Sequence, residues 1–218
     1  MRVIVTGTDQ PLGAATVERL MHNGATVASL STASADRGAA TRSVTDAIAS
    51  LGGADALVIS GWHAPLLAPV SFEDIDDSSF AAMWEGGLQG MLWTLQAAIP
   101  ALRASSGSVV VLMPTTAMTG GSHYAVAAAT FEAQRILMKA AARQLGPEGI
   151  RVNAVAVGAE LVLDDVEAAD VHYLAPNAIV GEQTGGDVAD IVTFLTSPAG
   201  RHLGGQTITI DGGRWLAP

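Results

Sequence analysis

The chain has 218 residues, and its 21 acidic side chains outnumber its 11 lysines and arginines, which gives a formal charge of −10. A chain of this length can bury the core of one large domain, whereas its negative charge argues against binding to nucleic acid or to anionic membranes. It contains no cysteine and no run of the roughly 20 apolar residues that span a membrane. Because the chain opens directly on a strand pattern, we expect no signal peptide and a cytoplasmic protein.

Short apolar runs alternate with segments of helical periodicity along the whole chain. The runs predict strands near residues 2–6, 25–30, 39–44, 54–60, 107–113, 150–156 and 206–210. The periodic segments predict helices near 12–23, 76–103, 122–145 and 186–196. This alternation is typical of a parallel sheet with helices on both faces. Residues 31–38 are too few for a helical crossover, which takes about a dozen residues, so a loop is expected between the second and third strands.

Two segments in the second half of the chain carry a recognisable pattern. Residues 139–153 read Lys-Ala-Ala-Ala-Arg-Gln-Leu-Gly-Pro-Glu-Gly-Ile-Arg-Val-Asn, and residues 205–213 read Gly-Gln-Thr-Ile-Thr-Ile-Asp-Gly-Gly. They resemble the active-site helix with its following strand, and the last strand, of the short-chain dehydrogenase/reductase family. The resemblance implies a single Rossmann-like domain over residues 1–218, with a doubly wound, seven-stranded parallel sheet. The family has a helix between strands 2 and 3, so the short spacing of residues 31–38 predicts that this helix is shortened or missing here. The resemblance also implies that residues 159–185 form a degenerate substrate loop.

The resemblance places the family's four catalytic residues on side chains of other kinds. The family uses a Tyr and a Lys four residues apart, a Ser thirteen residues before the Tyr, and an Asn on the preceding long helix. Counting without a gap from residues 139–153 puts the Tyr, Lys and Ser positions at Ala127, Phe131 and Pro114. Alignment of residues 85–90 on the glycine three residues later puts the Asn position at Gly87. None of these four side chains transfers a proton or carries a charge, and Lys139 is the only lysine in the chain. We therefore expect the family's catalytic residues to be missing.

The positions that would hold a dinucleotide also differ from the family pattern. Gly7 and Gly13 keep two of the three glycines of the phosphate-binding turn, but Pro11 occupies the middle position, where it offers no N–H. Ser43 stands where the family has an acid that contacts adenine, and Trp62 stands where a small residue lines the cofactor cleft. These replacements predict a vestigial site and no NAD(P) cofactor.

The leading functional hypothesis is a catalytically degenerate family member that acts as a structural or regulatory subunit. The expected helices near 80–103 and 122–145 carry long apolar faces, and in the family such helices pair between subunits. We therefore expect a homo-oligomer, or a hetero-oligomer with an intact relative, formed through these helices. No nucleic-acid or membrane partner is expected.

Two enzymatic readings remain open. In the first, the emptied cleft performs cofactor-independent chemistry of the isomerase, lyase or cyclase kind, with Tyr124, His123 and Arg135 as the candidate residues. In the second, which is the least favoured, the protein is an atypical NAD(P)-dependent oxidoreductase. The five histidines show no spacing typical of metal ligands, and no metal is expected.

Overall fold

The computed structural model describes residues 1–32, 36–169, 178–179 and 181–215. Within these residues, six parallel strands form one sheet in the order β2-β1-β3-β4-β5-β6. The strands are β1 (Arg2–Val5), β2 (Thr26–Ser29), β3 (Ala56–Ile59), β4 (Ser108–Pro114), β5 (Arg151–Val157) and β6 (Thr207–Ile210). No helix in this part of the chain is both long and apolar enough to cross a membrane.

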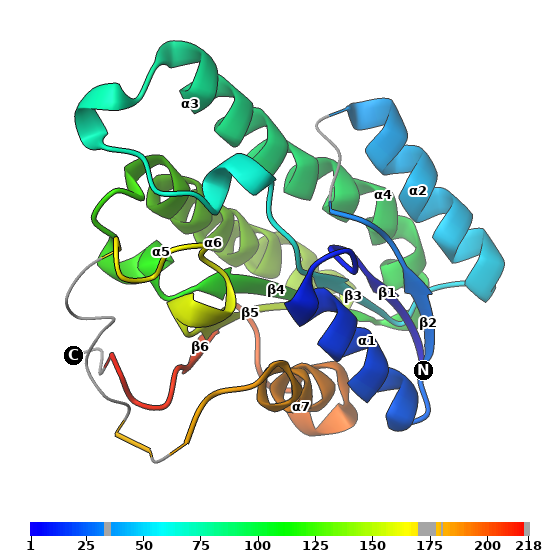
Figure 1. Cartoon of the computed structure of the whole chain (residues 1–218). Coiled ribbons are helices and arrows are strands. Elements are labelled where there is room, and N and C mark those ends of the chain that lie inside the picture. The colour runs from blue at the N-terminus through cyan, green and yellow to red at the C-terminus, as the bar shows by residue number, and fades with distance from the viewer. Residues whose placement is uncertain (33–35, 170–177, 180, 216–218) are drawn as a thin grey trace.

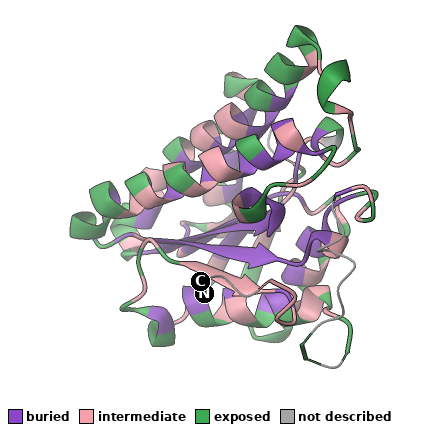
Figure 2. Cartoon of the chain, turned by 90° about the vertical axis from the view of Figure 1, so that its left-hand side faces the viewer, coloured by how far each residue is buried: buried purple, intermediate pink, exposed green. Residues whose placement is uncertain are grey.

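Helices cover both faces of the sheet (Figure 1). One layer contains α2 (Arg37–Leu51), α4 (Gly90–Ser105) and α6 (Ala125–Leu145), and the other contains α1 (Pro11–His22) and α7 (Gly185–Thr196). Two shorter helices, α3 (Asp77–Trp84) and α5 (Thr116–Thr119), complete the first layer. Strands β3 and β4 are buried along their whole length between the layers (Figure 2), as continuous apolar runs of a parallel sheet should be. The doubly wound α/β fold is therefore confirmed.

The predicted third strand at residues 39–44 is wrong, because this segment is the first half of α2. Its buried residues, Ala40, Val44 and Ala47, recur at intervals of four and three, which is the helical period. The carboxylate of Asp36 caps the helix by accepting a hydrogen bond from the N–H of Ala39 at 2.6 Å. The expected seven-stranded sheet is thus reduced to six strands, and β2 lies at the edge of the sheet.

The predicted long helix at 76–103 is confirmed as one run of helical backbone over residues 77–105, made of α3, a π-helical turn and α4. Residues 85–89, which join α3 to α4, form a π-helical turn. Gly87 lies in this turn, where an added Cβ atom would stand 2.6 Å from Cγ2 of Thr130 on α6. The other predicted helices are confirmed as α1, α6 and α7, with ends that differ by a few residues. Of the expected substrate loop at 159–185, residues 170–177 and 180 lie outside the described residues.

Three glycines let the backbone segments around β1 and β3 approach one another closely. A Cβ atom on Gly7 would lie 2.0 Å from the carbonyl oxygen of Ser60, and one on Gly13 would lie 2.1 Å from the carbonyl oxygen of Gly7. Gly61 has a φ of +97°, and its Cβ would lie 2.4 Å from Cα of Gly7. All of these neighbours are backbone atoms, which have little freedom to move. The turn after β1, the start of α1 and the loop after β3 therefore form one packed unit.

This packing predicts the effect of adding a single methyl group. Gly13→Ala should lower the free energy of unfolding by about 1–3 kcal/mol, the usual cost of overpacking, although alanine favours a helix over glycine. Gly146→Ala is the matched control, because nothing lies within 4 Å of its added Cβ. Urea denaturation of both variants measures the difference. Equal midpoints for the two variants would contradict the close packing at Gly13.

Candidate functional site

The carboxyl ends of the strands meet the loops that carry most of the predicted site residues. The chain runs from β1 outward to β2 and then returns to β3 on the other side of β1. This reversal creates a switch point between β1 and β3, and in open α/β sheets ligands bind in the crevice at such a point. Thr6 and the turn that follows it lie here, and the Thr6 hydroxyl donates a hydrogen bond to the carbonyl oxygen of Ser60 at 2.9 Å.

Pro11 is less harmful to phosphate binding than the sequence suggested. It occupies the first position of α1, where every helix has an N–H without an intrahelical partner. Proline therefore removes one donor but leaves the N–H groups of Leu12 and Gly13 in the same first turn. The Gln10 side chain, in the cap position, makes no capping bond to these groups. The start of α1 keeps the positive end of the helix dipole and donors for an anion.

A cavity of about 400 Å³ lies beside this turn, at the end of β2. Its wall combines hydroxyl groups with apolar side chains from the ends of β1 and β2, the residues that follow them, α2 and α4, namely Thr6, Ser29, Leu30, Ser31, Thr32, Ala40, Ser43, Val44 and Thr94. Ser43 reaches this wall from α2, and not from the end of a third strand as the sequence comparison assumed. The volume is within the range of small-ligand sites, and the lining suits an uncharged, hydroxylated group such as adenosine.

Trp62 is held by a residue that the sequence reasoning did not single out. The Gln10 side chain donates to the carbonyl oxygen of Trp62 at 2.7 Å and accepts from its N–H at 3.1 Å. The indole is 4% exposed and packs edge-on against the Phe131 ring, at a centroid distance of 6.3 Å. Trp62 is therefore part of the core between the β3 loop and α6, and it does not line the cavity at β2. The partners are 52 residues apart, so no local pattern predicts this contact.

The four positions assigned to the family's catalytic residues are all buried. Pro114 ends β4, Gly87 lies in the π-helical turn, and Ala127 and Phe131 lie on α6. Gly87 and α6 are directly linked, because the amide nitrogen Nε2 of Gln134 donates to the Gly87 carbonyl oxygen at 3.1 Å. These four side chains supply packing and no ionisable group.

The three alternative candidates are each held by separate partners. The hydroxyl of Tyr124 donates to the carbonyl oxygen of Asp165 at 3.0 Å, and burial raises the pKa of this phenol. His123 is exposed, with Nδ1 at 3.1 Å from the carbonyl oxygen of Ala168. Arg135 pairs with Glu132 one turn earlier on α6, and this hydrogen-bonded carboxylate raises the pKa of the guanidinium. Tyr124 and His123 therefore anchor the loop after β5, whereas Arg135 belongs to a pair on the helix surface.

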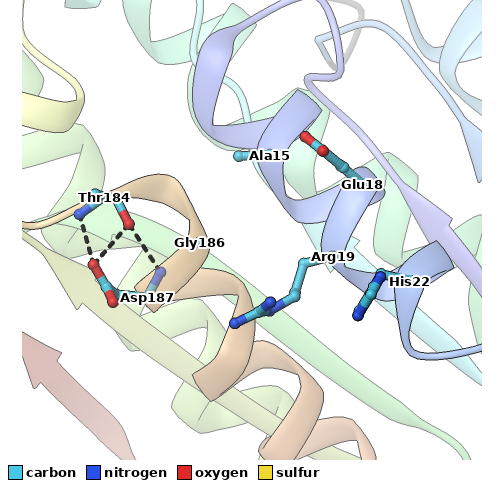
Figure 3. Close-up of a pocket in the computed structure, with 7 residues that line it drawn as sticks. All are labelled: Ala15, Glu18, Arg19, His22, Thr184, Gly186 and Asp187. Carbon is cyan, nitrogen blue, oxygen red and sulfur yellow. Dashed lines mark hydrogen bonds between the residues drawn. The ribbon is translucent and has the colours of Figure 1, made fainter.

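A second cavity, of about 370 Å³, lies between α1 and α7 (Figure 3). Arg19 extends from α1 toward α7, and Glu18 and His22 line the cavity from the same helix. Thr184 and Asp187 are used by a capping box, and Arg19 forms an ion pair with Asp190 at 2.6 Å. In the described part of the chain, no group of three or more histidines and carboxylates could hold a metal ion. The Arg19–Asp190 ion pair therefore joins the two helices, whereas the capping box stabilises the start of α7.

Comparison with known proteins gives matches over nearly the whole chain. A family model described as enoyl-(acyl carrier protein) reductase matches residues 1–214. An uncharacterised short-chain type dehydrogenase/reductase from Sinorhizobium fredii is 30% identical over 191 residues, which are 82% of this chain and 72% of that protein. A 3-oxoacyl-(acyl-carrier-protein) reductase from Staphylococcus aureus is 33% identical over 136 residues, which are 59% of this chain and 54% of the reductase.

Solved structures share the fold along the entire length. A short chain dehydrogenase from Burkholderia cenocepacia, in complex with NADP, is 27% identical with a TM-score of 0.85 over 98% of this chain and 97% of its own. A dehydrogenase/reductase from Sinorhizobium meliloti superposes with a TM-score of 0.86 at 24% identity, over 99% of this chain and 95% of its own.

These relatives correct two expectations from the sequence. The hypothesis of a catalytically degenerate subunit is contradicted, because the matching proteins are reductases and dehydrogenases. The expectation of no cofactor and a vestigial site is contradicted as well, because a structural neighbour is an NADP complex. The physical error was to count Pro11 and Trp62 as losses, because Pro11 leaves the helix donors in place and Trp62 is buried in the core. Ser43 does line the cavity at β2, but from α2 instead of a third strand. The chain belongs to the short-chain dehydrogenase/reductase family.

Proposed function

We propose that this protein is an oxidoreductase that binds a nicotinamide dinucleotide at the carboxyl edge of its sheet. The observation that carries the proposal is the packed glycine turn at the switch point, where Gly7, Gly13 and Gly61 bring the start of α1 close to the loop after β3. The family match over residues 1–214 supports it. So does the NADP complex of the Burkholderia cenocepacia dehydrogenase.

The residues of the turn and of the neighbouring cavity fit the adenosine and phosphate groups of such a cofactor. The N–H groups of Leu12 and Gly13 would hold the pyrophosphate, since the positive end of a helix favours an anion. The hydroxyls around the cavity at β2, including those of Ser31 and Thr32, would contact the adenosine portion. When bound, the cofactor supplies a hydride acceptor or donor. We propose a hydroxyl group, or the corresponding carbonyl, as the substrate class.

The apolar residues on and beside α6 would affect proton transfer in this protein. In our proposal Gly87, Pro114, Ala127 and Phe131 replace the family's proton-transferring residues, so the substrate would exchange its proton with water. A positioned general acid contributes about 10²–10⁴-fold to a rate. We therefore expect turnover to be slower by about this factor than in a relative that has such an acid.

We further propose that the protein is oligomeric through α4 and α6. On α6, Ala127 and Phe131 are buried against the rest of the chain, whereas Ile136 is 52% exposed and Ala140 is exposed as well. An exposed isoleucine beside small residues on a long helix suits contact with another helix. The partner would be a second copy of this chain or an intact relative.

Cofactor binding is testable through the tryptophans. Titration with NADH or NADPH should change the intrinsic fluorescence saturably, because Gln10 connects Trp62 to the first turn of α1. Trp62→Phe should lose much of this change. The matched control Trp84→Phe should keep it, because Trp84 is a partly exposed residue of α3. Absence of saturation with either cofactor, in fluorescence and in calorimetry alike, would refute the proposed function.

The oligomer predicts a different response to two similar substitutions. Ala140→Asp would place a charge in the contact between helices, where burial without a partner costs several kcal/mol, and should dissociate the assembly. Ala49→Asp, at an exposed position on α2, should leave it intact. Light scattering coupled to size exclusion measures both. A monomeric wild type, or an Ala140→Asp assembly of unchanged mass, would contradict the proposal.

A further inference from the structure

A third cavity, of about 410 Å³, lies at the opposite edge of the sheet from the proposed cofactor site. Lys139, Ala142 and Arg143 line it from the last two turns of α6, and residues 204–206 line it directly before β6 begins. Because the strands are parallel, the start of β6 lies at the amino edge of the sheet, whereas the glycine turn lies at the carboxyl edge. The cavity is therefore separate from the glycine turn and from the cavity at β2.

The described lining of this cavity includes two cations and no carboxylate. Elsewhere in the described part of the chain, the ion pairs join other side chains, and neither the Lys139 ammonium nor the Arg143 guanidinium forms a hydrogen bond. The chain has 21 acidic residues for its 11 lysines and arginines, so carboxylates are abundant. These two cations nevertheless share a cavity without a counter-charge.

The helix itself does not explain this pair of charges. Lys139 and Arg143 are four residues apart, and like charges at this spacing destabilise a helix. The negative end of the helix dipole favours Arg143, which lies in the last turn, but this effect does not extend beyond that turn. Lys139 precedes the last turn, and no acid lies three or four residues from it. An anion in the cavity would stabilise both groups.

The wall opposite α6 is fixed in place and leaves room for a ligand. The N–H of Gly205 donates to the carbonyl oxygen of Val152 at 2.8 Å, and the N–H of Gln206 donates to Oδ1 of Asn153 at 3.1 Å. Both bonds hold this wall against the start of β5. A Cβ atom on Gly204 would have no neighbouring heavy atom within 4 Å. The space in front of the two cations is therefore open, and its far side is already ordered.

We infer that this cavity binds the phosphate group of a small phosphate monoester. Such a group carries nearly two negative charges at neutral pH, which matches the two cations. Arginine binds phosphate through its planar guanidinium, and lysine binds it as a point charge. The volume exceeds the needs of a phosphate group and is within the range of small-ligand sites, so the organic part of the ester would lie against Ala142 and the glycine wall.

The charge of the chain favours a small ligand over a polyanion. With a formal charge of −10, the protein repels nucleic acid and anionic membrane surfaces, whereas salt screens a small anion from distant carboxylates. The site is compatible with the proposed oligomer, because Lys139 and Ala142 lie one and two residues from Ala140 and so occupy another face of α6. The inference is independent of the proposed function, since the cavity shares no residue with the cofactor site.

The test is calorimetric titration with phenyl phosphate above neutral pH. The wild type should bind it saturably, and should bind benzoate, which carries one charge, more weakly. The double variant Lys139→Gln/Arg143→Gln should weaken phenyl phosphate binding at least about tenfold, the effect of losing a hydrogen bond to a charged group. The control Arg37→Gln/Arg42→Gln removes the same charge from exposed positions of α2 and should leave the dissociation constant unchanged.

Each alternative result would overturn the inference. Absence of saturable binding, or equal affinity for benzoate, would refute the assignment of a phosphate site. A Lys139→Gln/Arg143→Gln variant that is folded by thermal unfolding and keeps the wild-type dissociation constant would place the bound phosphate elsewhere. Equal weakening in the two double variants would show a general effect of net charge. Cofactor binding is measured separately, by the NADH and NADPH titrations.

Discussion

The fold and its proposed site both depend on the close crossing of three backbone segments at the switch point. Gly7, Gly13 and Gly61 are glycines because any side chain there would overlap backbone atoms. The crossing fixes the first turn of α1 against the end of β3, and it aims the helix donors at the crevice between β1 and β3. The same atoms thus meet the structural requirement for tight packing and, in the proposed function, the requirement for anion binding. This explains why these glycines can be kept while other positions of the site differ.

Side chains of the glycine turn form hydrogen bonds with both neighbouring parts of the site. Asp9 binds the residues after β2, and Gln10 binds the loop after β3 through both polar groups of the Trp62 backbone. The turn therefore lies between the cavity suited to adenosine and the apolar edge formed by Trp62 and Phe131. An anion bound at α1 would contact a unit that already connects the two halves of the crevice.

The sequence predicted the helices α1, α6 and α7 because their apolar periodicity is regular. It predicted the layered α/β fold because the central strands β1, β3, β4 and β5 are short, largely buried apolar runs. It failed at residues 37–51, where Ala, Val and Thr fit a strand as well as a helix. There the cap at Asp36 and the spacing of Ala40, Val44 and Ala47 carried the decisive signal. The site was less predictable, because the contacts of Asp9 and Gln10 join residues 23 and 52 positions apart. When positions are compared one at a time, Pro11 and Trp62 appear to remove cofactor contacts. Their effect on binding instead depends on the packing around them.

The central claim is that the first turn of α1 and the cavity at β2 together hold a dinucleotide. A crystal structure grown with a saturating concentration of NADH tests this most directly. The account predicts density for the pyrophosphate at the N–H groups of Leu12 and Gly13, and for adenosine between Thr32 and α2. An ordered glycine turn with no cofactor density beside it, under conditions that saturate a related dehydrogenase, would contradict the account.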